Sequence, residues 1–193
     1  MKRRTFDKML TLVGIAVSLF LFLAAGLLNW GYTFTNNTVK SQLSAQEITI
    51  PAATQNSAED AATTAFFKVN GGKNMTTGKQ AQMYADHYLG FHLSRMGTYA
   101  AASAADRAAA AALAANPTDA ALQTAKTTAD ATLDTVFKGT TLRGTLLTAY
   151  AFWQMGQIAK LGAIAMLVGG LLLLGFSIAG WIHLRRTPED AMI

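Results

Sequence analysis

Two apolar stretches without a charged residue, residues 9–30 and 161–182, lie near the two ends of this sequence. Each is long enough to cross a bilayer, since a transmembrane helix needs about 20 apolar residues. A helix also hydrogen-bonds its own backbone, which a bilayer requires. We therefore predict a mainly α fold, an integral membrane protein with two transmembrane helices (N- and C-terminal) and an extracytoplasmic helical domain between them.

Basic residues lie on the terminal side of each apolar stretch. They are Lys2, Arg3, Arg4 and Lys8 before the first stretch, and Arg185 and Arg186 after the second. Positive charge next to a span tends to stay cytoplasmic. The expected order is a basic cytoplasmic tail (1–8), transmembrane helix 1 (9–30), an extracytoplasmic helical domain (31–160), transmembrane helix 2 (161–182) and a cytoplasmic tail (183–193). The expected location is a bacterial plasma membrane, with both termini cytoplasmic and the central domain outside.

The N-terminal residues KRRTFDK resemble a twin-arginine export signal. A cleaved signal has a shorter apolar core and small residues at its cleavage site, and Leu23-Ala24-Ala25 fits this pattern poorly. We expect an uncleaved signal-anchor. Whether the arginine pair directs twin-arginine export is left open by the sequence.

The segment between the spans is almost neutral. Residues 31–159 hold nine basic and eight acidic side chains, so most of the net charge of +5 belongs to the ends of the chain. This balance argues against a nucleic-acid partner. The chain has no cysteine, which excludes disulfides and cysteine-ligated metals. A domain of this size can bury a sufficient core by packing alone.

The central segment is predicted to be mostly helical. Thr77 is a candidate cap for a helix over 78–96, and a thin alanine-rich helix is expected over 100–115. Another helix should begin near Thr118 or Asp119 and end at Gly139. The remaining expectations are a helical continuation over 39–46, an extended stretch over 47–51, a loop over 52–60, a turn over 70–74, and a helix from about 141 to 185.

No residue pattern predicts catalysis, a cofactor or a metal. His87 and His92 are five apart, so one helix directs them about 140° away from each other and they cannot chelate one ion together. We expect His92 and Arg95 to form a buried polar link to another helix or to Glu47. Arg143 has apolar neighbours in sequence and is expected to have a fixed partner.

Aromatic residues are the other candidates for a site. One possibility is that they form core and interface contacts, and the alternative is that they line a ligand pocket; they are Tyr84, Tyr88, Phe91, Tyr150, Phe152 and Trp153. Small residues at i, i+4 spacing occur within the spans. Either they allow close helix contacts or they reflect the composition of such helices; the pairs are Gly14/Ser18, Ala165/Gly169 and Gly175/Ala179.

Three segments carry a family resemblance. They are FKGTTLRGTLLTAYAFWQMGQIA (137–159), AQMYADHYLGFHL (81–93), and VKSQL (39–43) followed by QEITIP (46–51). With these segments the chain resembles an uncharacterised group of two-span membrane proteins of actinobacteria, over most of its length outside the spans. Some members carry the label of an aromatic ring-opening dioxygenase. This sequence lacks the histidine and carboxylate set that such an enzyme needs, so the resemblance implies topology and location and no catalytic residue.

The expected function is that of a non-catalytic bacterial plasma-membrane protein, and not an enzyme. Its extracytoplasmic domain would act through protein contacts, as an accessory subunit or scaffold, with a respiratory or cell-envelope complex as host. The expected partners are the lipid bilayer and a membrane protein complex or homo-oligomer, without nucleic acid. The alternative is a membrane-anchored sensor that binds a small ligand or a lipid.

Reporter fusions test the predicted orientation. A fusion after Gln55 should report an extracytoplasmic position and a fusion at Ile193 a cytoplasmic one, because the basic ends hold both termini inside. The measurement is the activity of reporters that work on one side of the membrane only. A cytoplasmic signal at Gln55 would contradict the whole topology.

Overall fold

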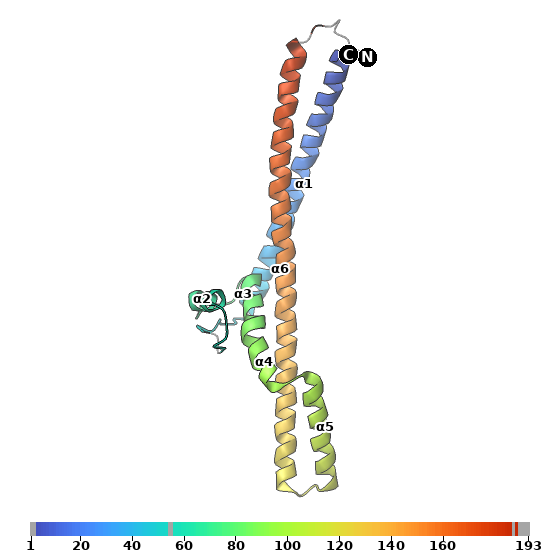
Figure 1. Ribbon diagram of the computed structural model, residues 1–193. Helices are drawn as coiled ribbons and strands as arrows, with labels where there is room; N and C mark the ends of the chain where they lie inside the picture. Colours follow the sequence, from blue (N-terminus) through green and yellow to red (C-terminus); the bar gives the residue numbers. More distant parts are fainter. Residues whose placement is uncertain (1–2, 54–55, 187, 189–193) are drawn as a thin grey trace. The chain divides into compact units, whose positions relative to one another are not determined.

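The computed structural model describes residues 3–53, 56–186 and 188, and the regular secondary structure of these residues is helical apart from one isolated bridge. The predicted helical fold class is thereby confirmed. The helices are α1 (Arg3–Ala45), α2 (Ala61–Asn70), α3 (Gly78–Met83), the π-helical η1 (Tyr84–Leu89), α4 (Gly90–Met96), α5 (Tyr99–Ala115) and α6 (Ala120–Arg186) (Figure 1). Gln55 and Ile193, the two fusion positions, lie outside the described residues.

The chain forms two compact units, and the long helices α1 and α6 contribute to both. We call the first the apolar unit; it comprises Met1–Asn37 and Gln154–Ile193. The second, the central unit, comprises Thr38–Trp153. Each unit is described separately below.

In the apolar unit, α1 and α6 are both long and apolar enough to cross a membrane. Their most apolar windows have mean hydropathies of 2.5 and 2.3, and only 17% of each window is buried. Most of their large apolar side chains are therefore exposed, which suits a lipid environment better than water. The two predicted spans exist as helices of the required length and composition, while the sidedness of their ends stays a prediction.

Small residues bring the two helices of this unit together. Ser18 is fully buried, and a Cβ added to Gly14 would lie 2.2 Å from Oγ of Ser177. A Cβ on Gly170 would lie 2.7 Å from the Phe22 ring. The Gly14/Ser18 pair thus makes a close helix contact. The other two predicted pairs do not, because Ala165, Gly175 and Ala179 are exposed.

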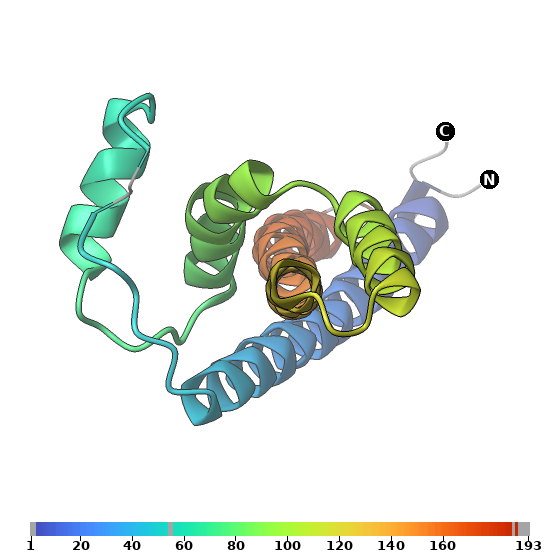
Figure 2. The same cartoon turned by 90° about the horizontal axis from the view of Figure 1, so that it is seen from below.

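The core of the central unit forms where the last turns of α1, the segment between Glu47 and Asn74, and helices α2, α3, η1 and α6 meet. Its fully buried side chains include Ile50, Phe67 and Met75. The expected extended stretch is present as a single bridge between Thr49 and Asn74. In Figure 2, α5 lies beside α6, the α3–α4 segment lies along another side of α6, and α2 lies beyond that segment.

The predicted helix over 78–96 is present. Thr77 caps it in a capping box with Gln80, and η1 interrupts its regular α geometry. The alanine-rich segment is a regular helix, α5, capped by Thr98 and ended at Asn116, with Ala102 as its buried residue. Asp119 accepts from the backbone N–H groups of Ala121 and Leu122 and begins α6.

The predicted helix end at Gly139 is wrong, because α6 continues without a break from Ala120 to Arg186. Gly139 instead lies at a close contact with Leu93 of α4. A Cβ there would lie 2.8 Å from Cδ2 of Leu93, so the missing side chain lets α4 lie close to α6. The expected continuous helix from about 141 to 185 is correct and is part of this longer element.

Gly78 and Gly144 test the packing on α6. A Cβ at Gly78 would lie 2.4 Å from Cβ of Trp153, whereas a Cβ at Gly144 would meet nothing within 4 Å. We predict that Gly78→Ala lowers the melting temperature of the purified protein by roughly 3–9 °C, since overpacking costs about 1–3 kcal/mol. The control Gly144→Ala should not lower it, because alanine favours an exposed helix. Equal shifts for the two variants would contradict this packing.

Candidate functional site

The π-helical segment η1 is the most unusual local structure of the central unit. Such segments are rare, and they occur frequently at functional sites. At its end the backbone N–H of Gly90 donates to the carbonyl of Ala85. The neighbouring residues Asp86 and His87 on this segment contact different parts of the unit.

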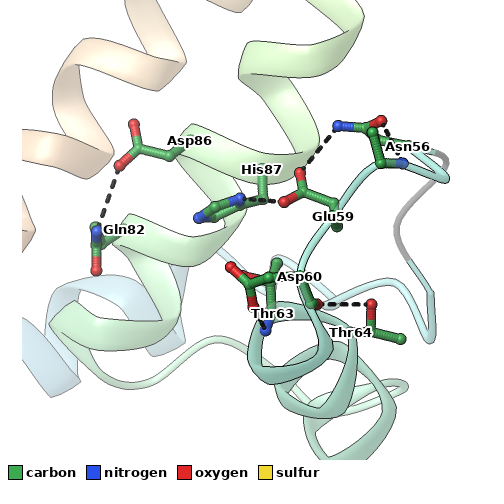
Figure 3. Close-up of polar contacts among 9 residues, drawn as sticks. Asn56, Glu59, Asp60, Thr63, Thr64, Gln82, Asp86 and His87 are labelled. Carbon is green, nitrogen blue, oxygen red and sulfur yellow. Dashed lines mark hydrogen bonds and ion pairs between the residues drawn. The ribbon is translucent and has the colours of Figure 1, made fainter.

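Asp86 connects the segment to α6. Nη2 of Arg143 donates to Oδ1 of Asp86 at 2.9 Å, and Nε of Arg143 donates to the Ala85 carbonyl at 3.1 Å. Nε2 of Gln82 donates to Oδ2 of Asp86 at 3.4 Å (Figure 3). The side chains of Arg143 and Asp86 are 41% and 32% exposed. Arg143 therefore has the fixed partner that the sequence led us to expect, in a half-buried position.

His87 contacts the loop before α2. Its Nδ1 lies 2.9 Å from Oε2 of Glu59, whose side chain is only 12% exposed, and Nδ2 of Asn56 donates to the other Glu59 oxygen (Figure 3). Asp60 next to Glu59 caps α2 and accepts from the Thr63 backbone N–H at 2.7 Å. That hydrogen bond, with a smaller contribution from His87, holds the pKa of Asp60 below its usual value.

The predicted buried link of His92 and Arg95 is wrong for Arg95, which is exposed. Arg95 lies in the last turn of α4, where its guanidinium sits 5.5 Å from the centre of the Phe91 ring. Among the described residues, the buried Nε2 of His92 has no hydrogen-bond partner. The His92 ring instead packs edge-on against the Tyr88 ring, with the two ring centres 4.7 Å apart.

The six aromatic candidates do not form one site. Tyr84, Tyr88, Phe152 and Trp153 pack against the hydrophobic core, and Tyr150 stacks on Trp153. Burial raises the pKa of Tyr84 above its usual value, and the nearby Tyr88 adds a smaller increase. Phe152 also lines a groove of about 490 Å³ between the last turns of α1 and the middle of α6 within the central unit, together with Thr38, Val39, Gln42, Thr145, Thr148 and Ala149.

A second, more polar groove of about 590 Å³ lies beside the Arg143–Asp86 pair. Thr140, Ser94 and Tyr99 also line it, so α4, α5 and α6 all contribute. The sequence analysis did not find this groove or the His87–Glu59 contact. Residues 59 and 87 are 28 positions apart, and no local pattern pairs them.

A half-buried ion pair connects α5 with α6. Nζ of Lys126 contacts Asp106 of α5 at 3.1 Å and also bonds Asp130 one turn along α6. The hydrogen bonds to Asp130 and then Asp106 raise the pKa of Lys126, and Lys126 lowers the pKa of Asp130. Within the described residues there is no cluster of three or more histidine, aspartate or glutamate side chains placed to hold a metal.

Comparisons with protein-family models, with curated proteins and with solved structures find no match to this chain. The resemblance to two-span actinobacterial proteins therefore stays a prediction from the sequence. Any function has to be argued from the residues and contacts described above.

We predict that Arg143→Ala destabilises the protein clearly more than Arg107→Ala. Removing Arg143 leaves Asp86 and the Ala85 carbonyl without their donors, at a cost of about 1–2 kcal/mol for a half-exposed charged pair, or roughly 3–6 °C in melting temperature. Arg107 is exposed on α5, and its removal should cost at most about 1 kcal/mol.

A double variant controls for nonspecific effects. In the Arg143→Ala background, Asp86→Ala should add little further loss, because the two side chains share one interaction. Equal and small shifts for Arg143→Ala and Arg107→Ala would show that the Arg143 contact contributes nothing to stability.

Proposed function

We propose that this chain is a non-catalytic protein of the bacterial plasma membrane whose central unit acts through protein contacts. In this role it is an accessory subunit or scaffold of a membrane complex, with a respiratory or cell-envelope complex as host. The charged side chains in the described part of the central unit support this. Arg143, His87 and Lys126 are each engaged in a contact that joins one element to another.

One observation carries the proposal. Tyr99 at the start of α5 and Phe137 on α6 lie against each other, with ring centres 6.0 Å apart, yet they are 48% and 54% exposed. Met96, three residues before Tyr99, is exposed as well. We call these three residues the Tyr99 patch. Aromatic residues and methionine are enriched at protein interfaces, so this patch is suited to a protein partner.

Membrane insertion is the second part of the proposal. The apolar unit exposes leucine, valine and phenylalanine side chains along both of its helices, and lipid is the solvent that accepts such a surface. The basic ends favour cytoplasmic termini and an extracytoplasmic central unit.

The Tyr99 patch can be tested by purification in a mild detergent followed by mass measurement. We predict that the chain runs as a complex or homo-oligomer well above its own 20.5 kDa. The double variant Tyr99→Ser and Phe137→Ser should shift it towards the monomer, because it removes the apolar contact area of the patch. Val69→Ser is the matched control, since Val69 is also exposed but lies on α2.

A strictly monomeric chain in several detergents would contradict the proposal. Equal dissociation by the Val69 control would place the contact elsewhere. The alternative function, a sensor of a small ligand or lipid, is favoured by the groove of about 490 Å³ that Phe152 lines. A small molecule that stays bound during the same purification, and is lost when Ala149→Phe fills that groove, would support the sensor instead.

A further inference from the structure

A groove of about 370 Å³ runs between α1 and α6 inside the apolar unit. On each helix its lining residues recur at i, i+3, i+4 and i+7, so one face of each helix forms one wall. The groove extends along about two turns, roughly 10 Å, which is less than half the thickness of a bilayer core. This length suits the upper part of one acyl chain.

Small residues create the space in this groove. Ala25 and Ala163 are buried at the contact of the two helices, and Gly26 beside them has no side chain. A Cβ added to Gly26 would meet nothing within 4 Å. Phe22 and Leu167 form the apolar end of the groove. The groove is therefore a real gap beside the helix contact, with apolar walls.

The other end of the groove is polar. Asn29 of α1 and Lys160 of α6 line it there, and both are exposed. Lys160 is the only charged residue within 9–37 and 154–182, so no acidic side chain of these segments can neutralise it. Its Nζ lies 5.1 Å from the centre of the Tyr32 ring, and this contact holds the ammonium near the groove without balancing its charge.

We propose that this groove binds one anionic phospholipid, with an acyl chain along Gly26 and Ala163 and the phosphate at Lys160 and Asn29. The inference rests on the membrane insertion proposed above. Charge complementarity selects the occupant, because a lipid phosphate is the anion that a bilayer offers at the end of an apolar groove. A neutral helix of another protein would fill the apolar part but leave the ammonium of Lys160 unpaired.

Native mass spectrometry of the full chain tests this site. The chain is purified in mild detergent and supplied with equal amounts of dioleoyl phosphatidylglycerol and dioleoyl phosphatidylcholine. We expect about fivefold preferential retention of the phosphatidylglycerol, which corresponds to about 1 kcal/mol for one basic residue. Lys160→Gln should abolish this preference. Arg185→Gln is the matched control, since Arg185 also lies over an aromatic ring, Trp181, but away from the groove, and it should keep the preference.

The apolar part of the site is tested with Gly26→Leu. Gly26 lines the groove and a Cβ there would meet nothing within 4 Å, so the leucine side chain should occupy the groove, and we expect loss of the retained lipid while Lys160 stays in place. Gly175→Leu is its control, because a Cβ at Gly175 also meets nothing within 4 Å but Gly175 does not line this groove. The control should retain phosphatidylglycerol as the unaltered chain does.

Four results would overturn the inference. Two concern the headgroup: equal retention of the two lipids by the unaltered chain, and equal loss of preference in Lys160→Gln and Arg185→Gln. Two concern the groove in Gly26→Leu: full lipid retention, and a change of oligomeric mass without lipid loss. The last result would identify the groove as a contact with a second copy. A chain that leaves the membrane without detergent would instead refute the insertion, which is a separate outcome.

Discussion

The central unit depends on the contact of Arg143 with Asp86 and with the carbonyl of Ala85. Arg143 offers a planar group with several donors, so it can satisfy a carboxylate and a backbone oxygen at the same time. The backbone oxygen belongs to η1, where the π-helical geometry alters the regular hydrogen-bond ladder. One side chain of α6 thus hydrogen-bonds both to the backbone and to a side chain of this local irregularity. His87, the next residue after Asp86, then reaches Glu59 and connects α2 to the same segment.

Close approach of helices is the second organising feature, and glycine provides it in both units. Gly78 accommodates Trp153 and Gly139 accommodates Leu93 in the central unit. In the apolar unit, Gly14 faces Ser177 and Gly170 faces Phe22. The absence of a side chain at these positions lets backbones approach and bury the neighbouring side chain, which offsets the conformational entropy that glycine loses in a helix.

The two units differ in which side chains they bury and which they expose. The central unit buries Phe67, Ile50 and Met75 completely and connects its elements with half-buried charges, as expected for a domain in water. The apolar unit buries mainly small residues and exposes its large apolar side chains, as expected for two helices long and apolar enough to cross a membrane. One group stands out in each unit. Lys160 is a charged residue in the apolar unit and lies over the Tyr32 ring. The Tyr99 patch exposes two aromatic rings in the central unit.

The sequence by itself determined the helical class, the two apolar helices, the helix start at Thr77, a second start at Thr118 or Asp119, and the need of Arg143 for a partner. These features follow from local composition, capping and periodicity, which act over a few residues. Only the tertiary structure decided that α6 continues through Gly139, because the Leu93 side chain that explains this glycine comes from a helix 46 positions earlier. It also decided that Asp86 and His87 separate towards α6 and Glu59, and that Arg95 stays exposed. Long-range pairing of this kind depends on which surfaces meet after folding, and no pattern within a single segment encodes it.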